Sequence, residues 1–366
     1  MDGSHRHEVG SPEETIYESL VRKGYSRRDF LRFCTAVTAA LALPAPFVSR
    51  VAEALETKKK PILVWLEFQD CAGNSEALLR ATKPTVGELI LDILSIEYHE
   101  TIMAAAGHQA EKSLADVVAN HKGNYIAAVE GSIPMKDGGV YCCIGGRSAK
   151  DIVTEVCGNA MATIAMGTCA CFGGLPAAAP NPTSAVGVSA ALPNIPVVNL
   201  SGCPVNVENI TATIVYFLTF GTLPPLDKFG RPLFAYGKRI HDNCERRAHF
   251  DAGQYVREWG DEGHRKGWCL YEMGCKGPET FHNCPRIKYN DGTSWPVGSG
   301  HGCIGCSEPA FWDGMTPFYE RLPQPPGFGV EATADKVGLG ITAVTGAAVA
   351  AHGIGRMITG KNTRKD

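Results

Sequence analysis

Residues 61–76 read PILVWLEFQDCAGNSE, and this stretch decides the fold. An unbroken apolar run fills residues 61–68, which is typical of a strand buried on both faces of a parallel sheet. A short polar turn containing Cys71 follows, and the pattern of residues 77–95 predicts a helix. Strand, turn and helix in this order are the first unit of a doubly wound α/β domain.

Later apolar segments continue the same sheet. Residues 126–129, 162–166 and 196–200 are expected to be further parallel strands, and residues 207–220 are expected to form a helix. The sequence therefore predicts a flavodoxin-like, doubly wound parallel sheet in a domain that covers residues 55–225.

Three of these strands are each followed by a cysteine, namely Cys71, Cys169 and Cys203. Ligands of open α/β sheets lie outside the carboxyl ends of the strands, so three thiols at this edge predict a cluster site. The alternative is three structural cysteines, since free cysteine is commonly buried. Their equivalent positions at three strand ends favour the cluster site.

A second group of candidate ligands lies in residues 241–306, with loop-like sequence between its members. Soft thiolates grouped in this way suit zinc or iron–sulfur clusters. Zinc prefers closed sets of four ligands, whereas the seven candidates here divide into four and three. A remainder of three thiolates fits a 3Fe–4S cluster. The four are His241, Cys244, Cys269 and Cys275, and the three are Cys284, Cys303 and Cys306.

Composition narrows the class of protein. The chain has 366 residues, enough for two domains with appendages, and its formal net charge of −3 gives no indication of nucleic-acid binding. Its fourteen cysteines indicate metal or redox chemistry in a cytosolic protein, or disulfides in an exported one.

The N-terminus bears on that choice. Arg27 and Arg28 precede an apolar run over residues 33–48, and a small-x-small site follows at residues 52–54. Residues 1–54 resemble a twin-arginine signal peptide. The alternative is an ordinary amphipathic helix. The twin-arginine route carries folded proteins, so the cysteines can receive clusters in the reducing cytoplasm before export.

The last segment, residues 331–366, is expected to be a membrane anchor. Residues 337–358 are rich in Gly and Ala and contain only His352 and Arg356 as strongly polar members. This pattern predicts a transmembrane helix whose basic end stays in the cytoplasm. The alternative is a soluble amphipathic helix.

A series of short motifs along nearly the whole chain resembles the small subunit of membrane-bound NiFe uptake hydrogenases. Each motif alone is weak, but their succession is specific. They are the twin-arginine leader, WLEFQDC, HETIMAAAGHQAE, YIAAVEGSIP, MGTCACFGG, NPT, SGCP, RIHDNCERRAHFDAG, GWCLYEMGCKGPE, GHGCIGC and the C-terminal segment.

The resemblance implies three clusters in a line, the second and third carried by a loop-rich domain over residues 226–330. It also places Pro296 near the open corner of the medial cluster, where proline cannot bind a fourth iron. The implied ligands are Cys71, Cys169 and Cys203 for a proximal 4Fe–4S cluster, Cys284, Cys303 and Cys306 for a medial 3Fe–4S cluster, and His241, Cys244, Cys269 and Cys275 for a distal 4Fe–4S cluster.

The chain departs from the family at the proximal site. Asn74 stands where the family has a further cysteine, and Gly174 stands at the position of another extra cysteine. The six-cysteine cluster of oxygen-tolerant members is therefore not expected. A 4Fe–4S cluster normally needs four ligands, and the candidates for the fourth are Asp70, Cys171 and Asn74, in that order of preference.

The resemblance further implies an electron-transfer subunit on the periplasmic side of the inner membrane. The nickel–iron centre belongs to a separate large subunit, so no catalytic residue is expected in this chain. Electrons are expected to leave at His241 for a membrane cytochrome b and quinone, in a heterodimer or a dimer of heterodimers. The rival interpretations are a cluster-bearing subunit of another quinone-linked redox complex and a zinc-stapled exported binding module.

Overall fold

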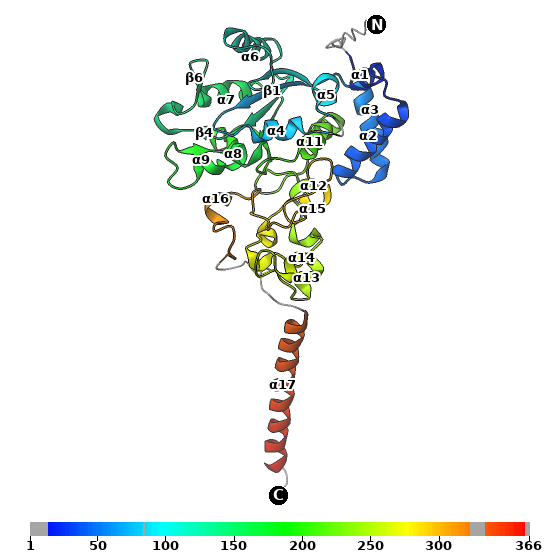
Figure 1. Cartoon of the computed structure of the whole chain (residues 1–366), viewed down its shortest axis with the longest axis vertical. Helices are drawn as coiled ribbons and strands as arrows, with labels where there is room; N and C mark the ends of the chain where they lie inside the picture. Colours follow the sequence, from blue (N-terminus) through cyan, green and yellow to red (C-terminus); the bar gives the residue numbers. More distant parts are fainter. Residues whose placement is uncertain (1–13, 83–84, 323–333, 363–366) are drawn as a thin grey trace.

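The computed structural model of this chain describes residues 14–82, 85–322 and 334–362. Figure 1 shows an α/β domain, a loop-rich domain below it and a long C-terminal helix at the far end of the loop-rich domain. The two domains meet at the carboxyl ends of the strands, where Thr168 of the first domain donates a hydrogen bond to the carbonyl of Cys306 in the second.

A five-stranded parallel sheet forms the centre of the first domain, with the strand order β2-β1-β3-β7-β9. Counted along the chain this order is 2-1-3-4-5, the flavodoxin-like form of a doubly wound sheet, so the predicted fold is confirmed. The strands are β1 (Ile62–Glu67), β2 (Ser95–His99), β3 (Tyr125–Glu130), β7 (Ala162–Met166) and β9 (Val197–Leu200); β4 (Ile133–Pro134) pairs with β8 (Ala185–Val186), and β5 (Cys143–Ile144) with β6 (Arg147–Ser148).

Both faces of the central strands are buried, which explains why β1, β3 and β7 are mostly apolar. In β1, Leu63 and Trp65 enter one core while Val64 and Leu66 enter the other, because side chains alternate along a strand. The first core is covered by α1 (Ile16–Arg22), α2 (Arg27–Ala40), α3 (Val48–Thr57), α4 (Gly73–Leu79) and α11 (Val207–Phe220), and the second by α6 (His108–Asn120), α7 (Ala149–Gly158), α8 (Gly167–Phe172) and α10 (Val188–Ala191).

The single helix predicted over residues 77–95 is wrong. The chain instead forms α4, the short α5 (Val86–Glu88), the π-helix η2 (Leu89–Ile93) and then the edge strand β2. Pro84 lies inside the predicted helix, and proline both removes a helical hydrogen bond and clashes with the preceding turn. β2 mixes polar with apolar residues, as suits an edge strand, and this composition hides it in the sequence.

The predicted leader is folded where the structure describes it. Phe30 and Cys34 of α2 and Val51 and Leu55 of α3 are fully buried in the first core, against α11. The predicted small-x-small site at residues 52–54 lies within α3, and both of its alanines are buried. That residues 1–54 serve as an export leader stays a prediction.

The second domain is built from short helices and loops around two small apolar clusters that include several of the cysteines. The candidate ligands therefore replace part of the core that a domain of this size would otherwise need. Its helical segments are α12 (Leu233–Tyr236), η4 (His241–Asn243), α13 (Arg247–Asp251), α14 (Glu262–Arg265), η5 (Tyr271–Met273), η6 (Gly277–Glu279), α15 (Cys284–Ile287) and α16 (Phe311–Gly314). The first domain contains one more short helix, α9 (Gly174–Ala177).

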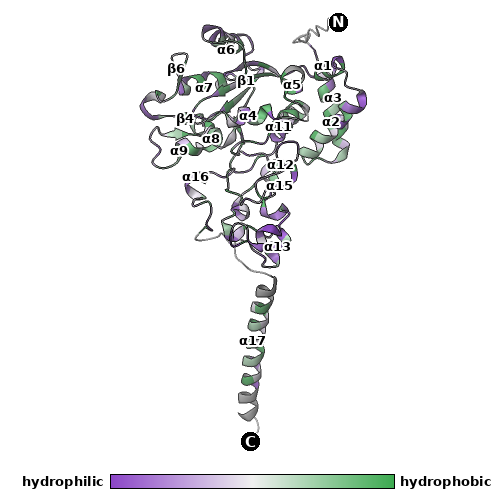
Figure 2. Cartoon of the chain, in the orientation of Figure 1, coloured by the Kyte–Doolittle hydropathy of each residue, from purple (hydrophilic) through white to green (hydrophobic). Residues whose placement is uncertain are grey.

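The segment predicted to span a membrane forms a helix, α17 (Ala334–Asn362). Within the described ranges, no helix combines the length and the apolar character that crossing a bilayer requires. Much of α17 is Gly and Ala, whose small side chains supply little apolar area. The polar side chains of His352 and Arg356 lower the hydropathy of the helix further. Figure 2 shows its hydrophobic residues interspersed with paler ones.

Candidate metal centres

The three strand-end cysteines come together at one edge of the sheet. Cys71 follows β1, Cys169 lies in the first turn of α8 after β7, and Cys203 follows β9. The pKa of the Cys203 thiol is raised to about 12, first by burial and then by the nearby thiols of Cys306, Cys169 and Cys71, because each disfavours a second negative charge. The structure thus brings the three predicted ligands to the same edge of the sheet.

Glycines make room for this group of sulfur atoms. A Cβ atom at Gly174 would lie 2.4 Å from the Cys169 Sγ, and one at Gly73 would lie 3.1 Å from the Cys71 Sγ. Gly174 also has a positive φ of 54°, which strains any other residue. These contacts explain why no side chain, cysteine included, fits at position 174 in this geometry.

Two of the three candidates for a fourth proximal ligand are already occupied. The Asn74 side chain is buried, donates to the Glu130 Oε1 over 3.0 Å and accepts from the Val205 backbone N over 2.9 Å. Cys171 is buried in the second core and its thiol contacts the Ala165 carbonyl, behind the sheet edge. Neither side chain is free to bind a cluster without breaking these contacts.

Asp70 is the candidate whose side-chain oxygen atoms are free to bind a metal. Its carboxyl accepts only one weak bond among the described residues, from the Ala72 backbone N at 3.4 Å. The pKa of Asp70 is raised to about 7, first by partial burial and then by repulsion from the carboxylates of Glu130 and Glu67. A cation at this point would relieve that repulsion, so the electrostatics suit an oxygen ligand.

A buried acidic network lies beside Asp70, and the sequence patterns did not reveal it. The carboxylate of Glu130 is fully buried and accepts from the Asn74 and Ser75 backbone N atoms, at 2.8 and 3.0 Å, and from the Trp65 Nε1 at 3.2 Å. The Ser75 hydroxyl bridges Glu130 and Glu67, 2.7 Å from each. Glu130 is the last residue of β3 and so lies at the same edge of the sheet as Cys71, which follows β1. This strand-end position could have identified Glu130 as a site residue from the sequence.

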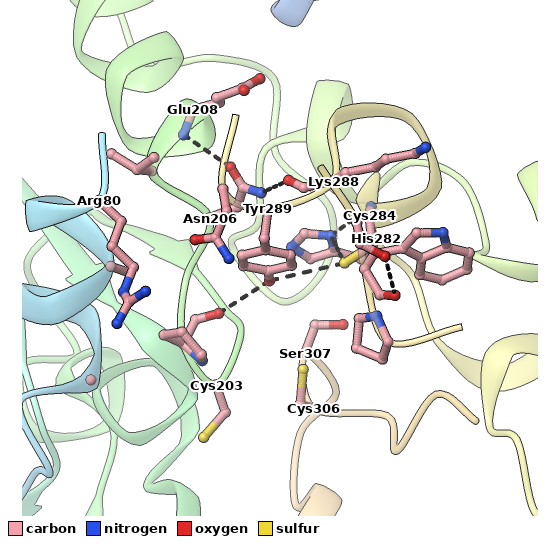
Figure 3. Close-up of a pocket in the computed structure, with 18 of the residues that line it drawn as sticks. Arg80, Cys203, Asn206, Glu208, His282, Cys284, Lys288, Tyr289, Cys306 and Ser307 are labelled. Carbon is pink, nitrogen blue, oxygen red and sulfur yellow. Dashed lines mark hydrogen bonds between the residues drawn. The ribbon is translucent and has the colours of Figure 1, made fainter. Parts of the chain in front are cut away.

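The three predicted medial ligands line one cavity of about 440 Å³ between the domains. Cys284, Cys303 and Cys306 share it with Pro296 and with Cys203 of the proximal group. Figure 3 shows Cys203 and Cys306 in the lower part of this cavity and Cys284 beside His282 and Tyr289.

His282 is a further residue of the medial site, which the sequence motifs did not single out. Its Nδ1 lies 2.9 Å from the Cys284 Sγ, and its buried Nε2 has no hydrogen-bond partner among the residues described. A histidine two residues before a ligand cysteine was the available signal.

The four distal candidates surround a second, smaller cavity, of about 20 Å³. They are His241, Cys244, Cys269 and Cys275. The buried His241 Nε2 has no partner in the described part of the chain, and its ring packs edge-on against Phe250 at 4.5 Å. Burial, with a further contribution from Arg247, lowers the pKa of His241 to about 4, so the imidazole stays neutral as a metal ligand must.

The spacing of these residues argues against zinc. A zinc ion holds thiolates at about 2.3 Å, so two sulfurs on one ion are at most about 4.6 Å apart. Among the described residues, only Glu67, Asp70 and Glu130 form a group of three potential ligands within 4.8 Å of one another. No three of the candidate cysteines and His241 are that close, so in this geometry three of them could not hold one zinc ion together.

Backbone N–H groups aimed at sulfur also fit iron–sulfur clusters, whose sulfurs accept such bonds. The Cys244 Sγ accepts from the Arg246 N at 3.4 Å, and the Cys303 Sγ accepts from the Gly305 N at 3.4 Å. The Cys275 Sγ accepts from the Cys303 N at 3.3 Å, so a candidate distal ligand and a candidate medial ligand are in direct contact. All fourteen cysteines are free thiols in the structure.

Two family models match the chain. Residues 71–217 match "NADH ubiquinone oxidoreductase, 20 Kd subunit", and residues 236–319 match the C-terminal part of the NiFe/NiFeSe hydrogenase small subunit. The two matches coincide with the α/β domain and the loop-rich domain, and together they span every candidate ligand except Asp70.

Relatives match over almost the whole chain. The "Uptake hydrogenase small subunit" of Azotobacter vinelandii is 47% identical over 339 residues, covering 93% of this chain and 94% of that protein. The "Quinone-reactive Ni/Fe-hydrogenase small chain" of Wolinella succinogenes is 48% identical over 343 residues, covering 92% and 97%. Among solved structures, the Ni-Fe-Se hydrogenase of Desulfomicrobium baculatum matches with a TM-score of 0.68 at 33% identity, over 72% of this chain and 100% of that one.

Proposed function

Because this chain belongs to the small subunits of NiFe hydrogenases, we propose that it conducts electrons away from hydrogen oxidation through three iron–sulfur clusters. Hydrogen would be split into two protons and two electrons in the large subunit with which such chains pair. The bound clusters would supply the redox chemistry, with 4Fe–4S at the proximal and distal sites and 3Fe–4S at the medial site.

The observation that carries this proposal is the unbroken succession of the three ligand groups. The medial Cys306 lies close enough to the proximal Cys203 to raise the pKa of the Cys203 thiol, and both residues line one cavity. The medial Cys303 and the distal Cys275 are in hydrogen-bond contact. A zinc-stapled module has no need for such a line of sites.

The chain's own part is to hold the ligands, of which Cys269, Cys284 and Cys303 are buried whereas Cys71 and Cys203 are exposed. The proximal set is Cys71, Cys169 and Cys203, with Asp70 proposed as the fourth ligand; the medial set is Cys284, Cys303 and Cys306; and the distal set is His241, Cys244, Cys269 and Cys275. Burial and N–H···S bonds are the means by which the protein sets cluster potentials. Electron paramagnetic resonance of the purified complex tests the proposal, since it distinguishes the 3Fe–4S cluster from the two 4Fe–4S clusters.

The medial site makes a specific prediction. Pro296→Cys would add a fourth thiolate at the rim of the cavity that holds Cys284, Cys303 and Cys306, so a fourth iron can be bound. The 3Fe–4S signal of the oxidised protein should then shrink by more than half. Pro296→Ala is the matched control and should leave the signal unchanged. An undiminished signal in the cysteine variant would mean that Pro296 does not face the open corner.

The electron acceptor is proposed from the relatives. The Wolinella succinogenes protein is named quinone-reactive, which supports a membrane quinone, reached through a cytochrome b partner, as the destination here as well. Exit at the distal site suits this route, because the distal cavity lies in the loop-rich domain, away from the sheet. With the leader of residues 1–54, this supports a location on the periplasmic face of the inner membrane.

The leader can be tested directly. In the folded chain Arg27 pairs with Glu56 and lies over the rings of Tyr17 and Phe30, at 5.2 and 5.5 Å. Replacing Arg27 and Arg28 together by Lys keeps the charge but removes the signal of the export route. Export, measured by cell fractionation, should stop; Arg32→Lys is the matched control. Undiminished periplasmic activity in the double variant would refute the leader assignment.

A further inference from the structure

One hydroxyl joins the proximal and medial ligand groups. Thr168 is buried and directly precedes the proximal ligand Cys169. Its Oγ1 donates a short hydrogen bond to the carbonyl of the medial ligand Cys306 and accepts from the Gly202 N at 3.0 Å. Gly202 in turn directly precedes the third proximal ligand, Cys203. A single side chain therefore connects the backbone beside two proximal ligands with that of one medial ligand.

A second contact reinforces this tie. The buried Ser201 hydroxyl donates to the carbonyl of Ser307, the residue after Cys306, over 2.8 Å. The Ser307 carbonyl also accepts from the Nη1 of Arg231 at 3.0 Å. Arg231 is 2% exposed and is held by Asp227 and Glu308, so the anchor of this contact cannot move freely.

We propose that Thr168, supported by Ser201, is the positioning residue that fixes the spacing between the proximal and medial clusters. This inference rests on the proposed three-cluster function and adds which residue sets the first step of the path. The hydroxyl has both a donor and an acceptor role, and both are used inside the protein, where unpaired polar groups are costly. Because the side chain is buried between two ligand loops, its hydrogen bonds act on the ligand geometry.

Spacing matters because electron tunnelling falls steeply with distance. The medial loop is attached at its other end to the distal group, through the Lys276 N, which donates to the Cys303 carbonyl at 2.7 Å. If the Thr168 tie is lost, Ser307 is still held by Ser201, but the Cys306 carbonyl is released, so this ligand can shift relative to the proximal side while the loop stays joined to the distal side.

The test compares Thr168→Val, Thr168→Ser and Thr163→Val in the complete cluster-loaded complex. Valine has the shape of threonine without the hydroxyl, and serine keeps the hydroxyl. Thr163 lies in β7, is equally buried, and its Oγ1 makes no hydrogen bond to any described ligand loop, so it is the matched control. The readout is the magnetic interaction between the proximal and medial clusters, seen as splitting in electron paramagnetic resonance.

Thr168→Val is expected to shrink and spread this splitting, since magnetic dipolar coupling falls with the cube of distance. Thr168→Ser and Thr163→Val should keep the wild-type splitting. An unchanged splitting in Thr168→Val, or a changed one in Thr163→Val, would overturn the inference. If the Thr168→Val complex does not bind its clusters, the splitting is measured in Ser201→Ala instead. A smaller splitting in Ser201→Ala supports the proposal, and a splitting equal to that of the wild type refutes it. A wild-type complex without any 3Fe–4S signal would instead refute the proposed function.

Discussion

Asp70→Ala is expected to remove the proximal cluster while Cys171→Ala leaves it in place. In the proposed proximal site, Cys71, Cys169 and Cys203 would supply three thiolates, and Asp70 has the carboxylate with a free oxygen beside them. Iron content should fall by one cluster, and electron delivery from hydrogen should fall by more than about tenfold, as loss of a metal-site ligand implies. Iron analysis and the proximal resonance signal measure the two effects.

Asn74→Ala completes this comparison. Asn74 holds the buried Glu130 carboxylate and the Val205 backbone, so its loss should cost about 2–3 kcal/mol of folding free energy, with the cluster retained. Loss of the cluster in only one of the three variants identifies the ligand. A full cluster in Asp70→Ala would refute our ranking, and a full cluster in all three would indicate water or a residue of the large subunit.

The same assignment gives a pH dependence. The pKa of Asp70 is raised to about 7 by partial burial and by Glu130 and Glu67. Above this pH the carboxylate is ionised and free to bind iron, and below it a proton competes for the same oxygen. The extra iron that the wild-type protein holds over the Asp70→Ala variant should therefore shrink as the pH falls below about 7. Iron content of the two proteins, measured across one pH series, checks this.

His241→Ala is expected to have the second large effect, at the other end of the path. The neutral, buried imidazole has no other partner for its Nε2 among the described residues, so its removal deprives the distal cluster of its one nitrogen ligand. Hydrogen-driven reduction of a dye should fall by more than about tenfold, while the medial 3Fe–4S signal persists.

Two further variants sharpen this test. His241→Cys keeps four ligands but replaces a neutral donor by an anionic one, which should lower the distal potential while retaining the cluster. His249→Ala is the control, because His249 lies in the adjacent helix and its Nδ1 contacts Gln254 at 2.6 Å instead of a ligand. Equal losses in His241→Ala and His249→Ala would mean that the effect is structural.

Local patterns in the sequence predict much of this molecule. The apolar run of β1 predicts a strand buried on both faces. Because parallel strands end at one edge of the sheet, the cysteines after β1, β7 and β9 are expected to lie at that edge. The patterns fail where local and distant signals disagree. Residues 77–95 have a helical pattern, yet Pro84 and the edge position of β2 decide their structure. The Gly and Ala content of residues 337–358 resembles a membrane helix, but α17 lacks the apolar area.

By itself, the sequence determined the doubly wound fold and the residue types of the candidate thiolate and imidazole ligands, because both depend on residue type and on short-range spacing. Only the tertiary structure decided which polar groups remain free to bind. Asp70, Cys171 and Asn74 are all near Cys71 or Cys169 in the chain, but Asn74 is held by Glu130 and Val205, and Cys171 faces the core. Whether a donor is free depends on hydrogen-bond partners from distant segments, as with Thr168 and Cys306, which are 138 residues apart.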